Sequence, residues 1–112
     1  MKFSKRMKVA GTFLKNRRQA IEKYVHYGSS FLLQREPDNE YDDNAIKVLL
    51  KTSNGGTLDI GYIPAKHAID LAPAMDAGNK FDAKFAMKII NENTGKFVGL
   101  VINVKDREVS DE

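Results

Sequence analysis

Apolar and polar residues alternate cleanly over residues 80–90, with the period of two that is typical of half-buried strands, and Ile46, Val48 and Leu50 share one face of another predicted strand. Turn residues separate these runs, and the segment Asn54-Gly55-Gly56 predicts a hairpin. The pattern predicts six strands, over residues 7–14, 29–36, 44–52, 57–63, 80–90 and 96–104. In the fifth strand, alternate apolar residues are expected to point inward: Phe81, Ala83, Phe85, Met87 and Ile89.

Two segments carry helical signals instead. Residues 16–24 are predicted to form a short helix with Asn16 as its N-cap. A second helix is predicted over residues 64–78, beginning at a proline and ending at a glycine, and Pro73 is expected to kink or split it. Four apolar residues of this helix recur at helical spacing and predict one buried stripe: Ala68, Leu71, Ala72 and Met75.

Six strands and two short helices, with hairpins dominating, predict a mainly β, α+β fold. We expect a small curled or barrel-like antiparallel sheet whose ends are covered by the helices. The absence of a strand-helix-strand repeat and of a phosphate loop argues against a doubly wound nucleotide-binding fold. We expect one domain over residues 1–106 and a disordered tail over residues 107–112.

Composition removes several classes of function. The 112 residues include no cysteine, and the two histidines, His26 and His67, cannot complete a structural zinc site by themselves. No apolar run approaches the length of a membrane span or of a signal-peptide core. We therefore expect a cytoplasmic protein that needs no cofactor and no metal.

The net charge of +3 conceals a strongly basic N-terminal segment. Residues 1–27 carry eight Lys or Arg and one acidic residue, Glu22. Such a run is either a solvated face or a surface that binds a polyanion. Lys15, Arg17 and Arg18 gather at the start of the first predicted helix, where the macrodipole disfavours cations unless an anion such as phosphate lies there.

The segment "REPDNEYDDNAIKVLL", residues 35–50, concentrates acidic and amide side chains before a strand. Its alternation is similar to the start of a calcium loop, but Asp43 replaces the turn glycine and Leu49 the closing glutamate. Asn39 and Asp42 can instead bond to their own backbone in a turn. Tyr41 can be a core aromatic, and the carboxylates can serve a metal-dependent nuclease.

The order of these residues resembles the HIRAN family. The resemblance rests on "LQREPDNEYDDNAIKV" followed by "IGYIPAKHAIDLAPAMDAG", and it extends over most of the chain. It implies an OB-like barrel that binds single-stranded DNA, in some members at a free 3′ end. Members often precede Swi/Snf-type translocases, whereas this chain is similar to the stand-alone members of bacteria and phages. A separately encoded helicase, translocase or nuclease is then an expected partner.

By this resemblance, Asn39, Tyr41 and Asp42 form the pocket for the DNA end. Tyrosine offers a stacking face that accepts any base, and Asp42 can accept a hydrogen bond from a 3′-hydroxyl. A carboxylate repels an internal phosphodiester, so an acidic pocket can select a terminus.

Other positions depart from the family pattern. An Arg-Tyr pair expected after the first glycine is replaced here by Thr12 and Phe13, and the lysine of the helix start is shifted by one, to Lys66. Phe13 is a candidate for stacking, Tyr62 for lining the pocket and Lys66 for a phosphate contact.

The sequence therefore predicts a binding module for single-stranded DNA or DNA ends that acts in repair, replication or mobile-element processing. A minimal metal-dependent nuclease and a protein-interaction adaptor are the alternatives. No histidine or lysine is evidently paired with the acidic segment, so we do not expect an enzyme. The sequence leaves the choice between DNA and RNA open.

Overall fold

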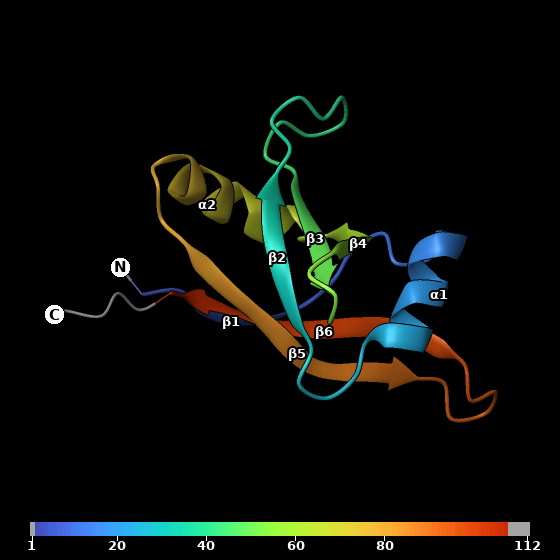
Figure 1. The fold of residues 1–112 in the computed structure, drawn as a ribbon. Helices are drawn as coiled ribbons and strands as arrows, with labels where there is room; N and C mark the ends of the chain where they lie inside the picture. Colours follow the sequence, from blue (N-terminus) through green and yellow to red (C-terminus); the bar gives the residue numbers. More distant parts are fainter. Residues whose placement is uncertain (1, 108–112) are drawn as a thin grey trace, which may run out of the picture.

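The computed structural model describes residues 2–107. In this part of the chain, six strands and two helices follow one another as Figure 1 shows. Their bounds are β1 Ser4–Lys8, α1 Lys15–Tyr24, β2 Ser30–Arg35, β3 Ile46–Lys51, β4 Thr57–Tyr62, α2 Ala65–Asp76, β5 Phe81–Ile90 and β6 Phe97–Asp106.

The strands form one antiparallel sheet in the order β1-β6-β5-β2-β3-β4. Ala10, just after β1, and Tyr62, at the end of β4, exchange backbone hydrogen bonds of 2.8 and 2.9 Å. This bridge joins the first strand of the sheet to the last, and we call it the seam. The predicted six-stranded OB-like antiparallel barrel is confirmed, because the seam curls the sheet onto itself.

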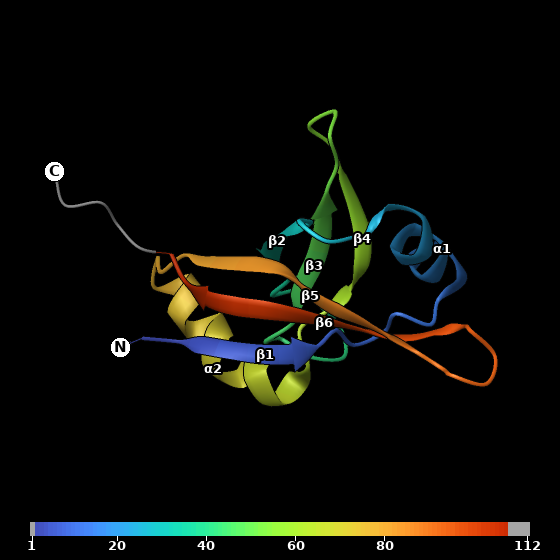
Figure 2. The same cartoon turned by 90° about the horizontal axis from the view of Figure 1, so that it is seen from below.

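The two helices lie at opposite ends of the molecule (Figures 1 and 2). Helix α1 contributes the buried Ile21 to the core, and α2 contributes Ala68, Leu71 and Ala72. The predicted stripe of α2 is thus confirmed for these three residues, while Met75 is half-buried and packs against the core. In the part of the chain that the structure describes, neither helix is long and apolar enough to cross a membrane.

The first predicted strand, over residues 7–14, is wrong except at its first two residues, because β1 spans Ser4–Lys8. Strand β1 ends at Lys8, and Gly11, with a φ of 73°, turns the chain away from the sheet. Such a φ is open to glycine at little cost, so the turn overrides the apolar pattern that follows. Asn16 is not the N-cap either, because α1 begins at Lys15 after Leu14 and has no side-chain cap.

Helix α2 runs unbroken through Pro73, so the prediction that this proline splits the helix is wrong. Pro73 lies near the end of α2. Because proline has no backbone N–H, it donates no hydrogen bond to the Ile69 carbonyl group, and Ile69 is an exposed residue. Pro64 is the N-cap rather than the first helical residue. The predicted stop at Gly78 is confirmed, since this residue has a φ of 100° and its N–H donates to the Met75 carbonyl at 3.0 Å.

The inward alternation predicted for β5 holds only in its first half. Phe81 and Ala83 are buried, whereas Met87 is 47% and Ile89 36% exposed. The register between β5 and β6 shifts between Phe85 and Met87, and this bulge changes the phase of the alternation. Strand β5 pairs with β2 only near its start, and the rest of the β5–β6 hairpin extends past the core, as Figure 1 shows.

Arg107, which we assigned to the tail, is held by the barrel. Its N–H donates to the Lys80 carbonyl at 2.9 Å, and its guanidinium pairs with Asp82 at 2.9 Å. Residues 108–112 lie outside the described part of the chain, so a disordered tail there stays a prediction.

Candidate nucleic-acid interface

The loop between β2 and β3, residues 36–45, is here called the acidic loop. Asn39 organises it, because its Oδ1 accepts the backbone N–H groups of Tyr41 at 2.9 Å and Asp42 at 3.1 Å. The Asn39 Nδ2 donates to Glu36 Oε1 at 2.7 Å. Both ends of the Asn39 amide are thus used within the protein, and the residue positions the loop.

Asp42 fixes the second half of the acidic loop. Its Oδ1 accepts the Asn44 N–H at 2.9 Å, and its backbone carbonyl accepts the Ala45 N–H at 3.1 Å. The predicted bonds of Asn39 and Asp42 to their own backbone are therefore confirmed. Among residues 2–107, no group of three or more His, Asp or Glu side chains is placed to hold a metal ion.

Tyr41 stands at the surface of this ordered loop. Its side chain is 90% exposed, which excludes the alternative of a core aromatic. The backbone on both sides is fixed by Asn39, so the ring projects from a defined position. An exposed aromatic ring with an ordered backbone is suited to stacking on a base, because the backbone entropy is already lost before binding.

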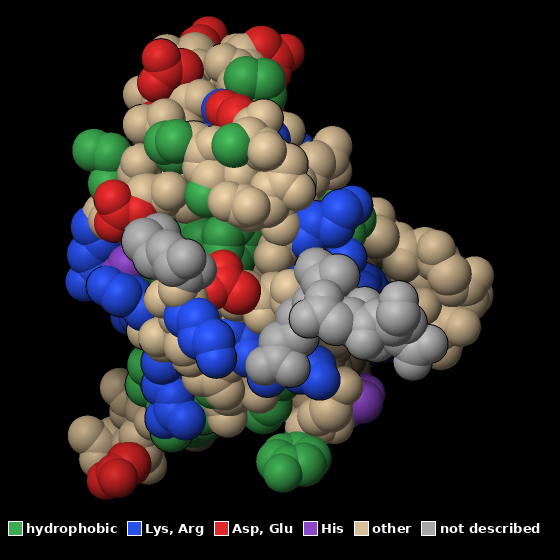
Figure 3. Space-filling model, turned by 90° about the vertical axis from the view of Figure 1, so that its left-hand side faces the viewer, with side chains coloured by type: hydrophobic (Ala, Val, Ile, Leu, Met, Phe, Trp, Pro, Cys, Tyr) green, Lys and Arg blue, Asp and Glu red, His purple; other side chains and the backbone are tan. Residues whose placement is uncertain are grey.

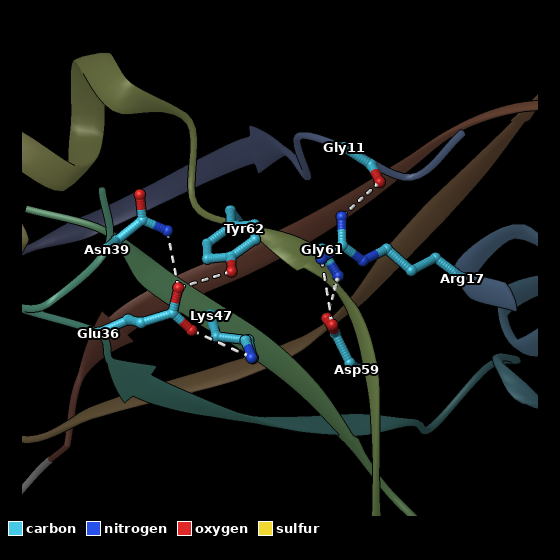
Figure 4. Close-up of polar contacts among 8 residues, drawn as sticks. All are labelled: Gly11, Arg17, Glu36, Asn39, Lys47, Asp59, Gly61 and Tyr62. Atoms are coloured by element: carbon cyan, nitrogen blue, oxygen red, sulfur yellow. Dashed lines mark hydrogen bonds and ion pairs between the residues drawn. The ribbon is translucent and has the colours of Figure 1, made fainter. Parts of the chain in front are cut away.

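Glu36 connects the acidic loop to the barrel (Figure 4). Besides the Asn39 amide, its Oε1 accepts the Tyr62 hydroxyl at 2.8 Å, and its Oε2 pairs with Lys47 Nζ at 3.0 Å. The hydrogen bond from Asn39, followed by those from Tyr62 and Lys47, lowers the pKa of Glu36 from 4.5 to about 2. We call these four residues the Glu36 network.

Tyr62 in turn meets α1 across the seam. The Arg17 guanidinium carbon lies 5.2 Å from the centroid of the Tyr62 ring, in a cation–π contact. Arg17 also donates to the Gly11 carbonyl at 3.0 Å and pairs with Asp59 at 3.1 Å, and its side chain is only 13% exposed. The structure therefore gives Arg17 a role in holding α1 against the seam.

Close approach at the seam explains Gly61. A Cβ at this position would lie 2.4 Å from the Ala10 carbonyl oxygen, and the φ of 143° is one that other residues rarely adopt. The Gly61 N–H donates to Asp59 Oδ1 at 3.1 Å, while the other carboxylate oxygen of Asp59 holds Arg17. A single acidic side chain thus braces both the backbone at the seam and α1.

Arg35 fixes the base of the acidic loop to α2. It forms a two-pronged ion pair with Asp76, at 2.9 and 3.1 Å, and donates to the carbonyl groups of Ala45 at 2.8 Å and Asp43 at 3.0 Å. The hydrogen bond from Arg35 lowers the pKa of Asp76. Sequence reasoning missed Arg35, because its partner lies 41 residues away and no local spacing marks the pair.

Sequence reasoning also missed Glu36 as the centre of the site. A signal was available, because the acid-proline pair opens the motif on which the family resemblance rests. Asp59 gave no comparable signal, since an exposed acid in a hairpin strand is common.

Three predicted site residues belong neither to the acidic loop, nor to the Glu36 network, nor to the contact between Arg17 and Tyr62. Phe13 is 67% exposed just before α1, Arg18 pairs with Glu22 at 3.0 Å, and Lys66 is exposed in the first turn of α2. In the described chain, none of the three forms a hydrogen bond or ion pair with the acidic loop. The structure therefore brings together Asn39, Tyr62 and Arg17 and leaves these others on the surrounding surface.

Charge is divided between the acidic loop and the body of the domain. In Figure 3, acidic side chains gather at the top, where the loop projects, and Lys and Arg side chains form a band across the middle. The positive potential of the body attracts a polyanion, whereas the tip of the loop repels one.

Comparisons with known proteins agree with this architecture. The family model of the HIRAN domain matches residues 4–108. The crystal structure of the HIRAN domain of human HLTF is similar, with 26% identity and a TM-score of 0.60 over 94% of this chain and 77% of that chain. A protein from Lactobacillus plantarum shares the fold, at 23% identity and a TM-score of 0.60, over 94% of this chain and 99% of that one. No curated protein matched the chain. Because the family model covers nearly the whole described barrel, the chain belongs to the HIRAN domain family.

Proposed function

We propose that this protein binds single-stranded DNA and captures its 3′ end at the acidic loop. Membership in the HIRAN family supports a DNA-binding module in general. The observation that carries the finer proposal is the exposed Tyr41 ring on a loop whose backbone is fixed by Asn39. A rigid stacking platform beside a carboxylate suits a terminal nucleotide.

Tyr41 and Asp42 have separate roles in this proposal. The Tyr41 ring stacks on the terminal base without selecting its identity. Asp42 uses Oδ1 to hold the Asn44 N–H, which leaves Oδ2 to accept a hydrogen bond from the 3′-hydroxyl. A phosphate at the same place offers no donor and carries negative charge, so it is rejected.

The surrounding residues contribute to binding in different ways. Phe13 and Lys66 are exposed, and they supply an aromatic face and a phosphate contact near the ends of the seam. Tyr62 lines the site through its half-buried ring and orients Glu36. Arg17 supports Tyr62 from the other side, so its contribution to DNA binding is indirect.

Fluorescence anisotropy tests this proposal with single strands that end in a 3′-hydroxyl, a 3′-hydrogen or a 3′-phosphate. The hydroxyl end should bind most tightly, because only it can donate to Asp42. Tyr41→Ala should weaken binding of all three ends by about 1 to 3 kcal/mol. Asp42→Asn should reduce the discrimination against phosphate.

Glu40→Gln is the matched control. Glu40 is an exposed residue of the same loop, and its substitution removes the same charge as Asp42→Asn. Equal effects of Asp42→Asn and Glu40→Gln would show that charge alone matters and would refute end capture. Unchanged binding in Tyr41→Ala would refute the stacking role.

In the cell, such a module serves DNA repair, replication or mobile-element processing. A domain that recognises ends without cutting them needs a helicase, translocase or nuclease to act on the bound strand. We propose that such a protein is the partner and that the domain itself catalyses no reaction.

A further inference from the structure

A second surface of the domain has the chemistry to bind a nucleic-acid backbone. A groove of about 580 Å³ lies between α1 and the far half of the β5–β6 hairpin. Four cationic side chains line it, together with one carboxylate, that of Glu22. The cations are Lys15, Arg18, Lys88 and Lys96.

The cations come from α1 and from the β5–β6 hairpin, and they line one groove. Lys15 and Arg18 belong to α1, Lys88 to β5, and Lys96 immediately precedes β6. Glu22 pairs with Arg18 at 3.0 Å, which leaves the three lysines in excess. Such convergence is unfavourable for the isolated protein, because like charges repel, and it becomes favourable when a polyanion lies between them.

The groove also has an apolar side. Ile90 lines it and is 47% exposed, and the buried Phe97 also lines it. Cations beside an exposed aliphatic surface match a single strand, which presents phosphates on one side and unstacked bases on the other. In a duplex the bases are paired and stacked inside, so their faces cannot contact the apolar side of the groove.

Helix α1 connects this groove with the seam. Arg17 points from α1 to Tyr62, whereas its neighbour Arg18 lines the groove. The groove shares no residue with the Glu36 network. It is therefore a separate feature of the surface, lined by other residues than those of the Glu36 network.

We propose that a single strand held by its 3′ end at the acidic loop continues past the start of α1 into this groove. Lys15, Lys88 and Lys96 contact the phosphates of internal nucleotides there, and Ile90 contacts a base. The proposal deepens the proposed function, because it names the path of the strand beyond its end.

The outer face of β1, β6 and β5 is the rival basic surface. Lys5, Arg6, Lys84 and Lys105 line it together with one carboxylate, that of Asp82, but Arg6 already donates to Asn103 at 3.3 Å. The face also belongs to one sheet, whereas the groove has walls from a helix and a hairpin. These features favour the groove.

A length series of fluorescein-labelled oligothymidines with 3′-hydroxyl ends tests the path. Strands of about 4 nucleotides reach only the acidic loop, whereas strands of about 12 nucleotides span both regions. Lys88→Ala with Lys96→Ala should leave the short strand unaffected and weaken the long one by about tenfold at low salt. The salt slope for the long strand should flatten by up to about 1.4, which corresponds to two phosphate contacts.

Lys84→Ala with Lys105→Ala is the matched control, because it removes the same charge from β5 and β6 on the outer face and leaves the groove intact. Equal losses in both double variants, or a loss confined to the control, would overturn the groove path. Weaker binding of the short strand in the groove variant would also overturn it. Lys88→Gln with Lys96→Gln keeps most of each side-chain stem and should give the same result.

The same series separates this proposal from the proposed function. If Tyr41→Ala weakens both lengths but the groove variants weaken neither, end capture stands and the groove path is wrong. If the groove variants weaken the long strand while Tyr41→Ala weakens neither, the groove contact stands and end capture is wrong.

Discussion

Glu36→Gln should destabilise the protein in a way that depends on pH. In the parent, the Glu36 carboxylate accepts hydrogen bonds from Asn39 and Tyr62 and pairs with Lys47. A glutamine can keep the first two bonds through its carbonyl oxygen, but both become bonds between neutral groups. Its NH₂ group then faces the Lys47 ammonium, where two donors meet.

The size of the loss follows from these contacts. Changing a charged acceptor into a neutral one costs about 1 kcal/mol per hydrogen bond, and the lost ion pair adds up to about 1 kcal/mol. The Glu36 side chain is 26% exposed, so solvent reduces each contribution. We expect a destabilisation of about 2 kcal/mol near neutral pH, or a Tm lower by about 8 °C.

The pH dependence has a defined sign. Because the pKa of Glu36 is lowered from 4.5 to about 2, its stabilising contribution is complete above pH 4.5. The contribution is lost as the pH falls from 4.5 to about 2 and the carboxylate is protonated. The stability difference between parent and Glu36→Gln should therefore shrink over this range.

Urea unfolding of parent and Glu36→Gln at pH values between neutral and about 3 measures this difference. Glu40→Gln is the control, because it removes an exposed carboxylate from the same loop and should cost little. A difference that stays constant as the pH falls, or equal losses in both variants, would refute the role of Glu36.

Three further predictions concern the seam, α1 and catalysis. Arg17→Ala should lower the free energy of unfolding, measured in urea, by about 2 kcal/mol, because two hydrogen-bonding partners and a cation–π contact are lost. Arg18→Ala, which loses one exposed ion pair, should lower it by about 0.5 kcal/mol. Gly61→Ala should cost about 3 kcal/mol through its clash at the seam, and Gly95→Ala, which meets nothing within 4 Å, about 1 kcal/mol. Incubation with DNA and Mg²⁺ or Mn²⁺ should leave the strands intact, and metal-dependent cleavage that Asp42→Asn abolishes would contradict a binding-only role.

Local patterns predicted the elements of this fold because hairpin strands and short helices follow from neighbouring residues. The hairpin at Asn54-Gly55-Gly56 and the stop at Gly78 depend on turn chemistry that the sequence shows directly. The phase of β5 after Phe85 did not follow from the pattern, because a bulge is fixed by pairing with β6. The end of β1 depended on Gly11, whose turn overrides the apolar run after it.

The contacts of the site also divide into local ones, which the sequence predicts, and distant ones, which it does not. Asn39 and Asp42 bond within a few residues of themselves, and their turn geometry was predictable. The contacts of Glu36 with Tyr62 and of Arg17 with Asp59 join residues 26 and 42 positions apart. Such pairs arise only when the seam closes the barrel, so one sequence without its fold gives no means of finding them.

The separation of charge within the domain bears on how an end can be selected. The basic body attracts any strand, and this attraction weakens as salt shortens the Debye length to about 8 Å at physiological ionic strength. At the tip of the acidic loop, a phosphate 4 Å from Asp42 would be repelled by about 4 kcal/mol at an effective dielectric constant of 20, whereas a hydroxyl there forms a charge-assisted bond. Added salt screens the attraction of the body more than this short-range contrast. Discrimination between ends should therefore persist at salt concentrations that weaken overall affinity, because the two effects act over different distances.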